Sequence, residues 1–182
     1  MISQILGRFA LFFACALLHE VGHVLMAIVV GAPTKRIHLT LLGTIGHIPT
    51  FNKLSDTRQM LILLAGPGVS LVLFLLWRSQ PFLAEVNLLL LVFNLLPIRP
   101  LDGGELFFII TSRFTGAINA NHLLKKSADL CVVLIFLAGL IQVYLYPFNV
   151  SLILLAVYLK KRANYCYQQT YRQFFRQLSQ RF

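Results

Sequence analysis

The first long apolar run of the chain covers residues 5–30, and its stretch 9–30 has the length of a membrane span but contains three ionisable side chains, two histidines and a glutamate. Residues 19–23 within it read His-Glu-Val-Gly-His. Ionisable groups inside a transmembrane helix are costly, so they indicate a functional site by default. Residues four apart share a helix face, so His19 and His23 can bind one metal ion together. Glu20 lies beside them, where it can handle the proton of a metal-bound water.

Four more apolar runs follow the first one. They cover residues 60–77, 82–96 (continuing past a break to 110), 128–146 and 148–159, the last of which is short. Hydrophobic residues make up 58% of the chain and its mean hydropathy is +0.76, too apolar for an ordinary soluble domain. The sequence therefore predicts an all-α polytopic membrane protein with about five transmembrane helices, the third of them broken.

The basic residues predict an orientation in the membrane. With five spans, the loops at 31–59 and 97–127 and the C-terminal segment fall on one side, and they hold all but Arg8 and Arg78 of the 16 lysines and arginines. The positive-inside rule makes this side cytoplasmic, so the N-terminus lies outside a bacterial cell membrane and the C-terminus inside. Because these charges line membrane-proximal loops, the net charge of +10 does not indicate a nucleic-acid partner.

Two segments differ from the apolar runs. Residues 37–50 alternate apolar and polar side chains and contain two glycines, which predicts a short membrane-associated β-hairpin after the first span. We expect this hairpin to pair with an unwound substrate strand. Residues 160–182 hold six basic and no acidic residues, with aromatics at helical spacing. They predict an amphipathic tail on anionic lipid, separate from a core at 1–159, with a partner helix as the alternative.

Two histidines leave a catalytic zinc short of ligands, because such a site takes three protein ligands and keeps the fourth position for water. Asp102 is the candidate third ligand. It follows the segment Asn-Leu-Leu-Pro-Ile-Arg-Pro-Leu at 94–101 and precedes two glycines. Prolines and glycines at this density break a helix, and a broken helix at membrane depth is tolerated where it lines a cavity. The ligand set and non-redox hydrolysis favour zinc over other metals.

Other residues near these motifs leave two interpretations open. Cys15, one turn before His19, could face the metal or serve as a small apolar residue. His38 and His47 could be polar loop residues or bind metal. The Ala-Gly-Pro-Gly stretch at 65–68 could serve close helix packing or shape the site directly.

Together these motifs resemble the site-2 protease family of intramembrane zinc metalloproteases, peptidase family M50. The resemblance rests on HEVGH in the first core span, AGP in the second and NLLPIRPLDGG in the third, and it covers roughly residues 14–112. It is closest to the bacterial sporulation factor IVFB branch. Unlike that branch, the sequence is expected to lack an extra N-terminal span and a C-terminal nucleotide-binding CBS domain, and no PDZ domain is expected either.

The resemblance implies a role for each matching residue. It assigns zinc to His19, His23 and Asp102, and the general base and acid to Glu20. It assigns site shaping and substrate binding to Asn94, Pro100 and Gly103. The implied activity is zinc-dependent cleavage of a membrane-tethered protein near the cytoplasmic face, in sporulation or another signalling process, with a membrane regulatory protein as a further partner.

Three other interpretations remain. A metal transporter or metal-sensing membrane protein would explain the histidines and Asp102, but it does not require Glu20 beside them. An inactive, protease-like binding module is the second, although every chemical residue is present. A polar cluster that only packs helices is the third, and the cost of burying three ionisable groups counts against it.

Overall fold

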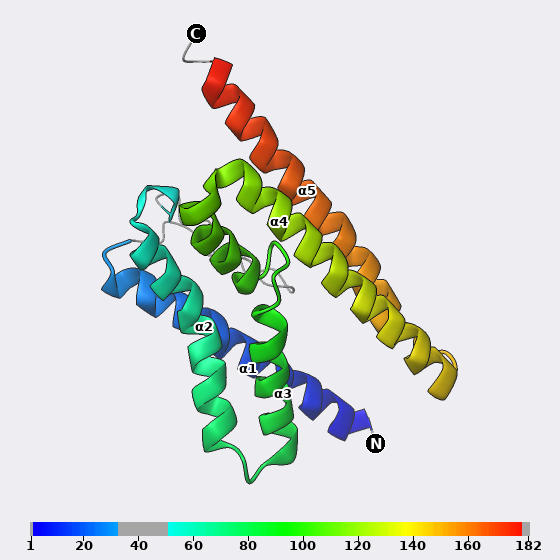
Figure 1. Cartoon of the computed structure of the whole chain (residues 1–182). Helices are drawn as coiled ribbons and strands as arrows, with labels where there is room; N and C mark the ends of the chain where they lie inside the picture. The colour runs from blue at the N-terminus through cyan, green and yellow to red at the C-terminus, as the bar shows by residue number, and fades with distance from the viewer. Residues whose placement is uncertain (1, 33–50, 180–182) are drawn as a thin grey trace. The chain divides into compact units, whose positions relative to one another are not determined.

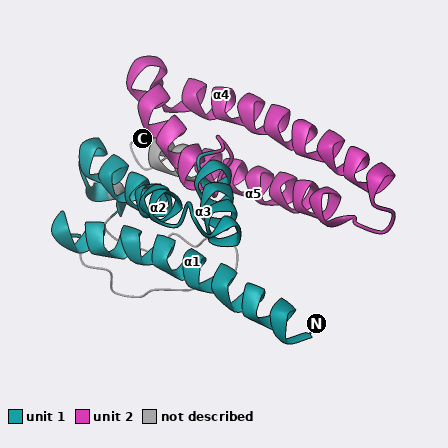
Figure 2. Cartoon of the chain, turned by 90° about the horizontal axis from the view of Figure 1, so that it is seen from below, with its two compact units in different colours: residues 1–95 teal, residues 96–182 magenta. Residues whose placement is uncertain are grey.

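The structure, a computed structural model, describes residues 2–32 and 51–179, with the backbone alone at residues 52 and 173–179. Five α-helices and one short 3₁₀ helix account for nearly all of this part of the chain, and it contains no strand (Figure 1). The chain divides into two compact units, residues 1–95 and 96–182 (Figure 2).

The first unit packs three helices against one another. They are α1 (Ile2–Val29), α2 (Asp56–Leu76) and α3 (Pro81–Asn94), and the 3₁₀ helix η1 (Phe51–Lys53) precedes α2. Asp56 in the first turn of α2 suits the positive end of the helix dipole. Pro81 begins α3, where the missing N–H costs nothing. A small core of Ala27, Ala32 and Ile62 joins the end of α1 to the start of α2.

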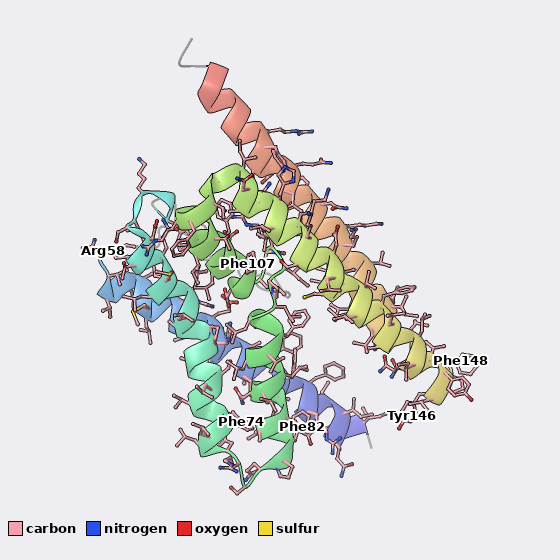
Figure 3. The ribbon with its side chains drawn as sticks, in the orientation of Figure 1. Arg58, Phe74, Phe82, Phe107, Tyr146 and Phe148 are labelled. Carbon is pink, nitrogen blue, oxygen red and sulfur yellow. The ribbon has the colours of Figure 1, made fainter. Side chains whose placement is uncertain are left out.

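The second unit pairs two long helices, α4 (Asp102–Leu145) and α5 (Ser151–Ser179), which lie side by side in Figures 1 and 2. Gly116 interrupts α4 with φ 78° and ψ 160°, so α4 consists of two helical stretches that meet at a kink. Tyr146 and Phe148 are in the turn between α4 and α5, and both side chains are exposed (Figure 3).

Among the described residues, three helices are long and apolar enough to cross a membrane: α1, α2 and α4. Helix α3 is apolar but shorter. Large apolar side chains are exposed along all of these helices, among them Leu76, with Phe74 and Phe82 exposed in part, as expected of helices solvated by lipid (Figure 3).

The predicted break in the third span is found, because α3 ends at Asn94 and α4 begins at Asp102. The number of five transmembrane helices stays a prediction. The expectation of a loop at 97–127 was wrong in part: from Asp102 onward this segment belongs to α4, which bends at Gly116 and packs along α5. The predicted hairpin at 37–50 lies outside the described residues. Helix α5 runs without a break across residue 159, and the division into core and tail stays a prediction.

Candidate metal centre

Helix α1 approaches the backbone of α2 at Gly22, within the His-Glu-Val-Gly-His motif. A Cβ at Gly22 would lie 2.8 Å from Val69 Cγ2 and 2.9 Å from the Ala65 carbonyl oxygen, so no larger residue fits without moving a helix. Small residues permit this kind of close helix packing in membranes. His19 precedes Gly22 by three residues and His23 follows it directly. The close packing of α1 on α2 at Gly22 therefore brings both imidazoles into contact with residues of α2.

The two imidazoles converge through their Nε2 atoms. His19 Nε2 and His23 Nε2 are 3.3 Å apart, and the ring centroids are 5.0 Å apart. Two nitrogen ligands at about 2.0–2.1 Å from a tetrahedral zinc are separated by about 3.3–3.4 Å. The spacing in the structure therefore equals the spacing that a zinc ion would require, and the predicted metal-binding pair is assembled within the first unit.

The other ring nitrogens are held by α2. His23 Nδ1 lies 2.7 Å from the Ile62 carbonyl oxygen, which can only accept a hydrogen bond. The Nδ1 proton is therefore donated to Ile62, and a neutral His23 presents an unprotonated Nε2. His19 Nδ1 lies 2.9 Å from Ser70 Oγ, and both residues are buried. Partners of this kind fix the tautomer and the ring orientation of metal-binding histidines.

Gly66 on α2 lies directly against the imidazoles of His19 and His23. A Cβ at this position would lie 2.7 Å from His19 Nε2 and still closer to His23 Nε2. The glycine in the Ala-Gly-Pro-Gly stretch therefore leaves the space that the two nitrogens face. Of the two interpretations of this stretch, the structure favours direct shaping of the site at Gly66.

Glu20 follows His19 on α1 and is half-buried. A carboxylate next in sequence to one histidine of an i, i+4 pair is the arrangement of helical metalloprotease motifs, in which it acts as the general base. Glu20 has this place in the sequence of α1, and its role stays a prediction.

Asp102 lies in the second unit, at the first position of α4. It is 7% exposed. The break before it contains a cis peptide bond between Arg99 and Pro100, and Leu101 N donates a 2.8 Å hydrogen bond to the Ile98 carbonyl. Prolines at 97 and 100 end α3 and prevent helix until Leu101, so the carboxylate stands at a helix start as predicted.

The three predicted substrate-binding residues surround this break. Asn94 is the last residue of α3, and its Nδ2 donates a 2.9 Å hydrogen bond to the Leu90 carbonyl. Pro100 follows the cis peptide bond, and Gly103 is buried in the first turn of α4. Their roles toward a substrate stay predictions.

Several residues of the centre were missed from the sequence. Ser70 is a polar residue within an apolar helix, and that position alone was a usable signal. Gly22 carried no signal, because nothing in the sequence says which face of α1 meets α2. Cys15 is buried and accepts a 3.4 Å hydrogen bond from Asn87 Nδ2 on α3. His38 and His47 lie outside the described residues.

The two imidazoles of the first unit can bind one zinc ion together. Imidazoles whose Nδ1 atoms are held in this way are good zinc ligands, and Asp102 as the third ligand stays a prediction. Two histidine nitrogens and one carboxylate oxygen are a donor set found in catalytic zinc sites, which keep a fourth position for water.

Comparisons with known proteins find similarity to metalloproteases. The profile of peptidase family M50 matches residues 75–138, which include Asp102. A zinc metalloprotease of Methanocaldococcus jannaschii is 30% identical over 82% of this chain and 46% of its own length. Stage IV sporulation protein FB of Bacillus subtilis is 31% identical over 79% of this chain and 52% of its own.

A solved structure of a protease is also similar to this chain. The site-2 protease from Methanocaldococcus jannaschii superposes with a TM-score of 0.64 at 26% identity, covering 86% of this chain and 75% of that one. The chain spans between about a third and about a half of the length of the curated relatives it matches.

Proposed function

We propose that the chain is a multi-pass membrane protein of the site-2 protease family of M50 peptidases and acts as an intramembrane zinc metalloprotease. The substrate we propose is a membrane-tethered protein, cleaved within or near its transmembrane segment close to the cytoplasmic face. The observation that carries the proposal is the convergence of His19 Nε2 and His23 Nε2 at 3.3 Å, inside a helix long enough to span a membrane.

We propose that His19, His23 and Asp102 hold the zinc ion. When bound, zinc acidifies a water molecule toward a pKa of about 7 and polarises the scissile carbonyl. Hydrogen bonds from the Nδ1 atoms to the Ile62 carbonyl and the Ser70 hydroxyl orient the two histidine rings. The aspartate adds one negative charge, which leaves the centre electrophilic enough to act on a peptide carbonyl.

Glu20 is the proposed general base. Its carboxylate takes the proton of the attacking water and delivers it to the nitrogen of the leaving amine. Asn94, Pro100 and Gly103 are proposed to bind the substrate strand next to the break. A substrate helix satisfies its own backbone hydrogen bonds, so it must unwind before cleavage, and residues 37–50 are the proposed partner for the unwound strand.

We propose an orientation with the N-terminus outside and the C-terminus in the cytoplasm of a bacterial cell. The distribution of basic residues supports it. The proposed partners are the substrate, a membrane regulatory protein and anionic lipid along the C-terminal segment. A sporulation role is proposed by analogy with the Bacillus relative, with other signalling roles as the alternative.

A metal transporter is the second candidate function, because it too would use His19, His23 and Asp102. The Glu20→Gln variant separates the two. As a protease, this variant retains zinc but no longer cleaves a membrane-tethered reporter that the wild-type chain cleaves. As a transporter, it retains zinc flux into proteoliposomes. Continued cleavage by Glu20→Gln would refute Glu20 as the base.

A further inference from the structure

Arg99 is a buried cation in the break that precedes Asp102. It is 7% exposed, although the loop predicted at 97–127 would have placed it among exposed basic residues on the cytoplasmic side. In the motif NLLPIRPLDGG it occupies one of the two positions between the prolines that the family resemblance leaves unassigned. A buried arginine needs partners for its guanidinium, because an unpaired charge away from water is strongly unfavourable.

Two of these partners lie on the first turns of α4. Arg99 Nη2 forms an ion pair with Glu105 Oε2 at 2.7 Å. The guanidinium carbon also lies 4.1 Å from the centre of the Phe108 ring, in a cation–π contact. Asp102, Glu105 and Phe108 follow one another at three-residue intervals and therefore lie near one another on α4. Arg99 thus contacts the same helix from which Asp102 projects.

The third partner lies on α5. Arg99 Nη1 donates a 3.0 Å hydrogen bond to Thr170 Oγ1. The Thr170 hydroxyl in turn donates to the Cys166 carbonyl at 3.2 Å, which leaves its lone pair directed at the arginine. One guanidinium therefore connects the break, the start of α4 and the C-terminal helix, all within the second unit.

The backbone around Asp102 leaves little freedom. A Cβ on Gly104 would lie 2.5 Å from the Ile98 carbonyl carbon and 2.6 Å from Arg99 N, so the first turn of α4 packs directly on the break. Gly104 N also donates a 3.0 Å hydrogen bond to the Leu101 carbonyl. Because Arg99 belongs to this packed turn, a shift of its side chain would be transmitted to the backbone that carries Asp102.

We propose that Arg99 is a positioning residue for Asp102, and that Thr170 makes the C-terminal helix part of the support of the metal centre. This inference rests on the proposed function, in which Asp102 binds zinc. A planar guanidinium can hold a carboxylate, a hydroxyl and an aromatic ring at once, whereas a lysine ammonium cannot reproduce that geometry. Groups that orient a metal ligand typically contribute about 10–100-fold to metal affinity.

The test compares full-length variants purified in detergent by two measurements that do not require a substrate. Competition with a chromophoric chelator gives the zinc affinity, and the visible absorption of the cobalt-substituted protein reports the ligand geometry. Arg99→Met is expected to lower zinc affinity by about 10–100-fold and to change the cobalt spectrum. Arg99→Lys is expected to rescue it only in part.

A milder pair of variants keeps the test valid if Arg99→Met fails to fold. Thr170→Val removes only the hydroxyl and is expected to lower zinc affinity about two- to tenfold, the range of one hydrogen bond, while Thr170→Ser restores it. The matched control is Asp129→Asn. It removes the 2.6 Å ion pair between Asp129 and Lys160, which also links α4 to α5, and it is expected to leave both measurements unchanged.

The outcomes separate this inference from the proposed function. Weaker zinc binding by the Arg99 and Thr170 variants, with Asp129→Asn unchanged, supports the positioning role. Wild-type affinity and spectrum in both Arg99→Met and Thr170→Val overturn it, and so does an equal loss in Asp129→Asn, which would indicate general α4–α5 packing. If the wild-type chain binds no zinc, or if Asp102→Asn binds it unchanged, the proposed ligand set is refuted instead.

Discussion

Replacing Gly66 with alanine should remove zinc from the centre without removing any ligand. The added methyl group would lie 2.7 Å from His19 Nε2 and closer still to His23 Nε2, in the space between α2 and the two nitrogens. The two nitrogens are already 3.3 Å apart, the spacing that zinc requires. No rotation of one ring can relieve both contacts and preserve that spacing.

The expected fall in zinc affinity follows from the displacement of one histidine ligand from its position. Disturbing a group that merely orients a ligand costs about 10–100-fold in metal affinity, so displacing the ligand should cost at least about 100-fold. The overpacked site should also lower the free energy of unfolding by about 1–3 kcal/mol. Activity should fall with zinc occupancy.

Gly68→Ala is the matched control, because Gly68 lies two residues away on α2 and a Cβ there meets nothing within 4 Å. Metal analysis of the purified proteins and chelator competition measure occupancy and affinity, and thermal unfolding measures stability. Gly68→Ala should bind zinc as the wild type does. Wild-type zinc affinity in Gly66→Ala would show that the metal does not lie between the two Nε2 atoms, and the reasoning would be refuted.

Three further predictions concern hydrogen bonds and packing within each unit. Ser70→Ala removes the partner of His19 Nδ1 and should lower zinc affinity about 10–100-fold in chelator competition, whereas unchanged affinity would mean that the hydrogen bond does not orient the ring. Gly22→Ala places a methyl group against a carbonyl oxygen of α2 and should lower the free energy of unfolding by about 1–3 kcal/mol in a denaturant titration; a wild-type midpoint would contradict the close approach. Burial raises the pKa of Tyr167, whose hydroxyl donates a 3.2 Å hydrogen bond to the Leu124 carbonyl. The folded state therefore favours the protonated phenol. The contribution of Tyr167 to the free energy of unfolding is complete below the unfolded pKa of about 10 and is lost as pH rises through the folded pKa. Tyr167→Phe should therefore flatten the alkaline fall in thermal stability, and an unchanged profile would contradict it.

Local sequence rules predicted the parts of the centre that depend on one helix or one break. The four-residue spacing of His19 and His23 places them on one face of α1 regardless of what packs there. The prolines at 97 and 100 end α3 by geometry alone, so the position of Asp102 at a helix start was also predictable.

Contacts between helices were beyond the same rules. Helix α2 is apolar on all sides, so periodicity cannot show which face meets α1, and the contact of Ser70 with His19 spans 51 residues. The burial of Arg99 was missed for a related reason. Its partners Glu105, Phe108 and Thr170 come together only when α4 packs on the break and on α5.

The central claim is that this chain hydrolyses a peptide bond of a membrane-tethered protein with zinc and Glu20. Its most direct test is mass-spectrometric profiling of new protein termini in bacterial membranes that contain either the wild-type chain or Glu20→Gln at equal zinc occupancy. We predict at least one new terminus within or beside a transmembrane segment, formed with the wild type and absent with Glu20→Gln. The same termini with both proteins, or none that depends on the wild type, would contradict the claim.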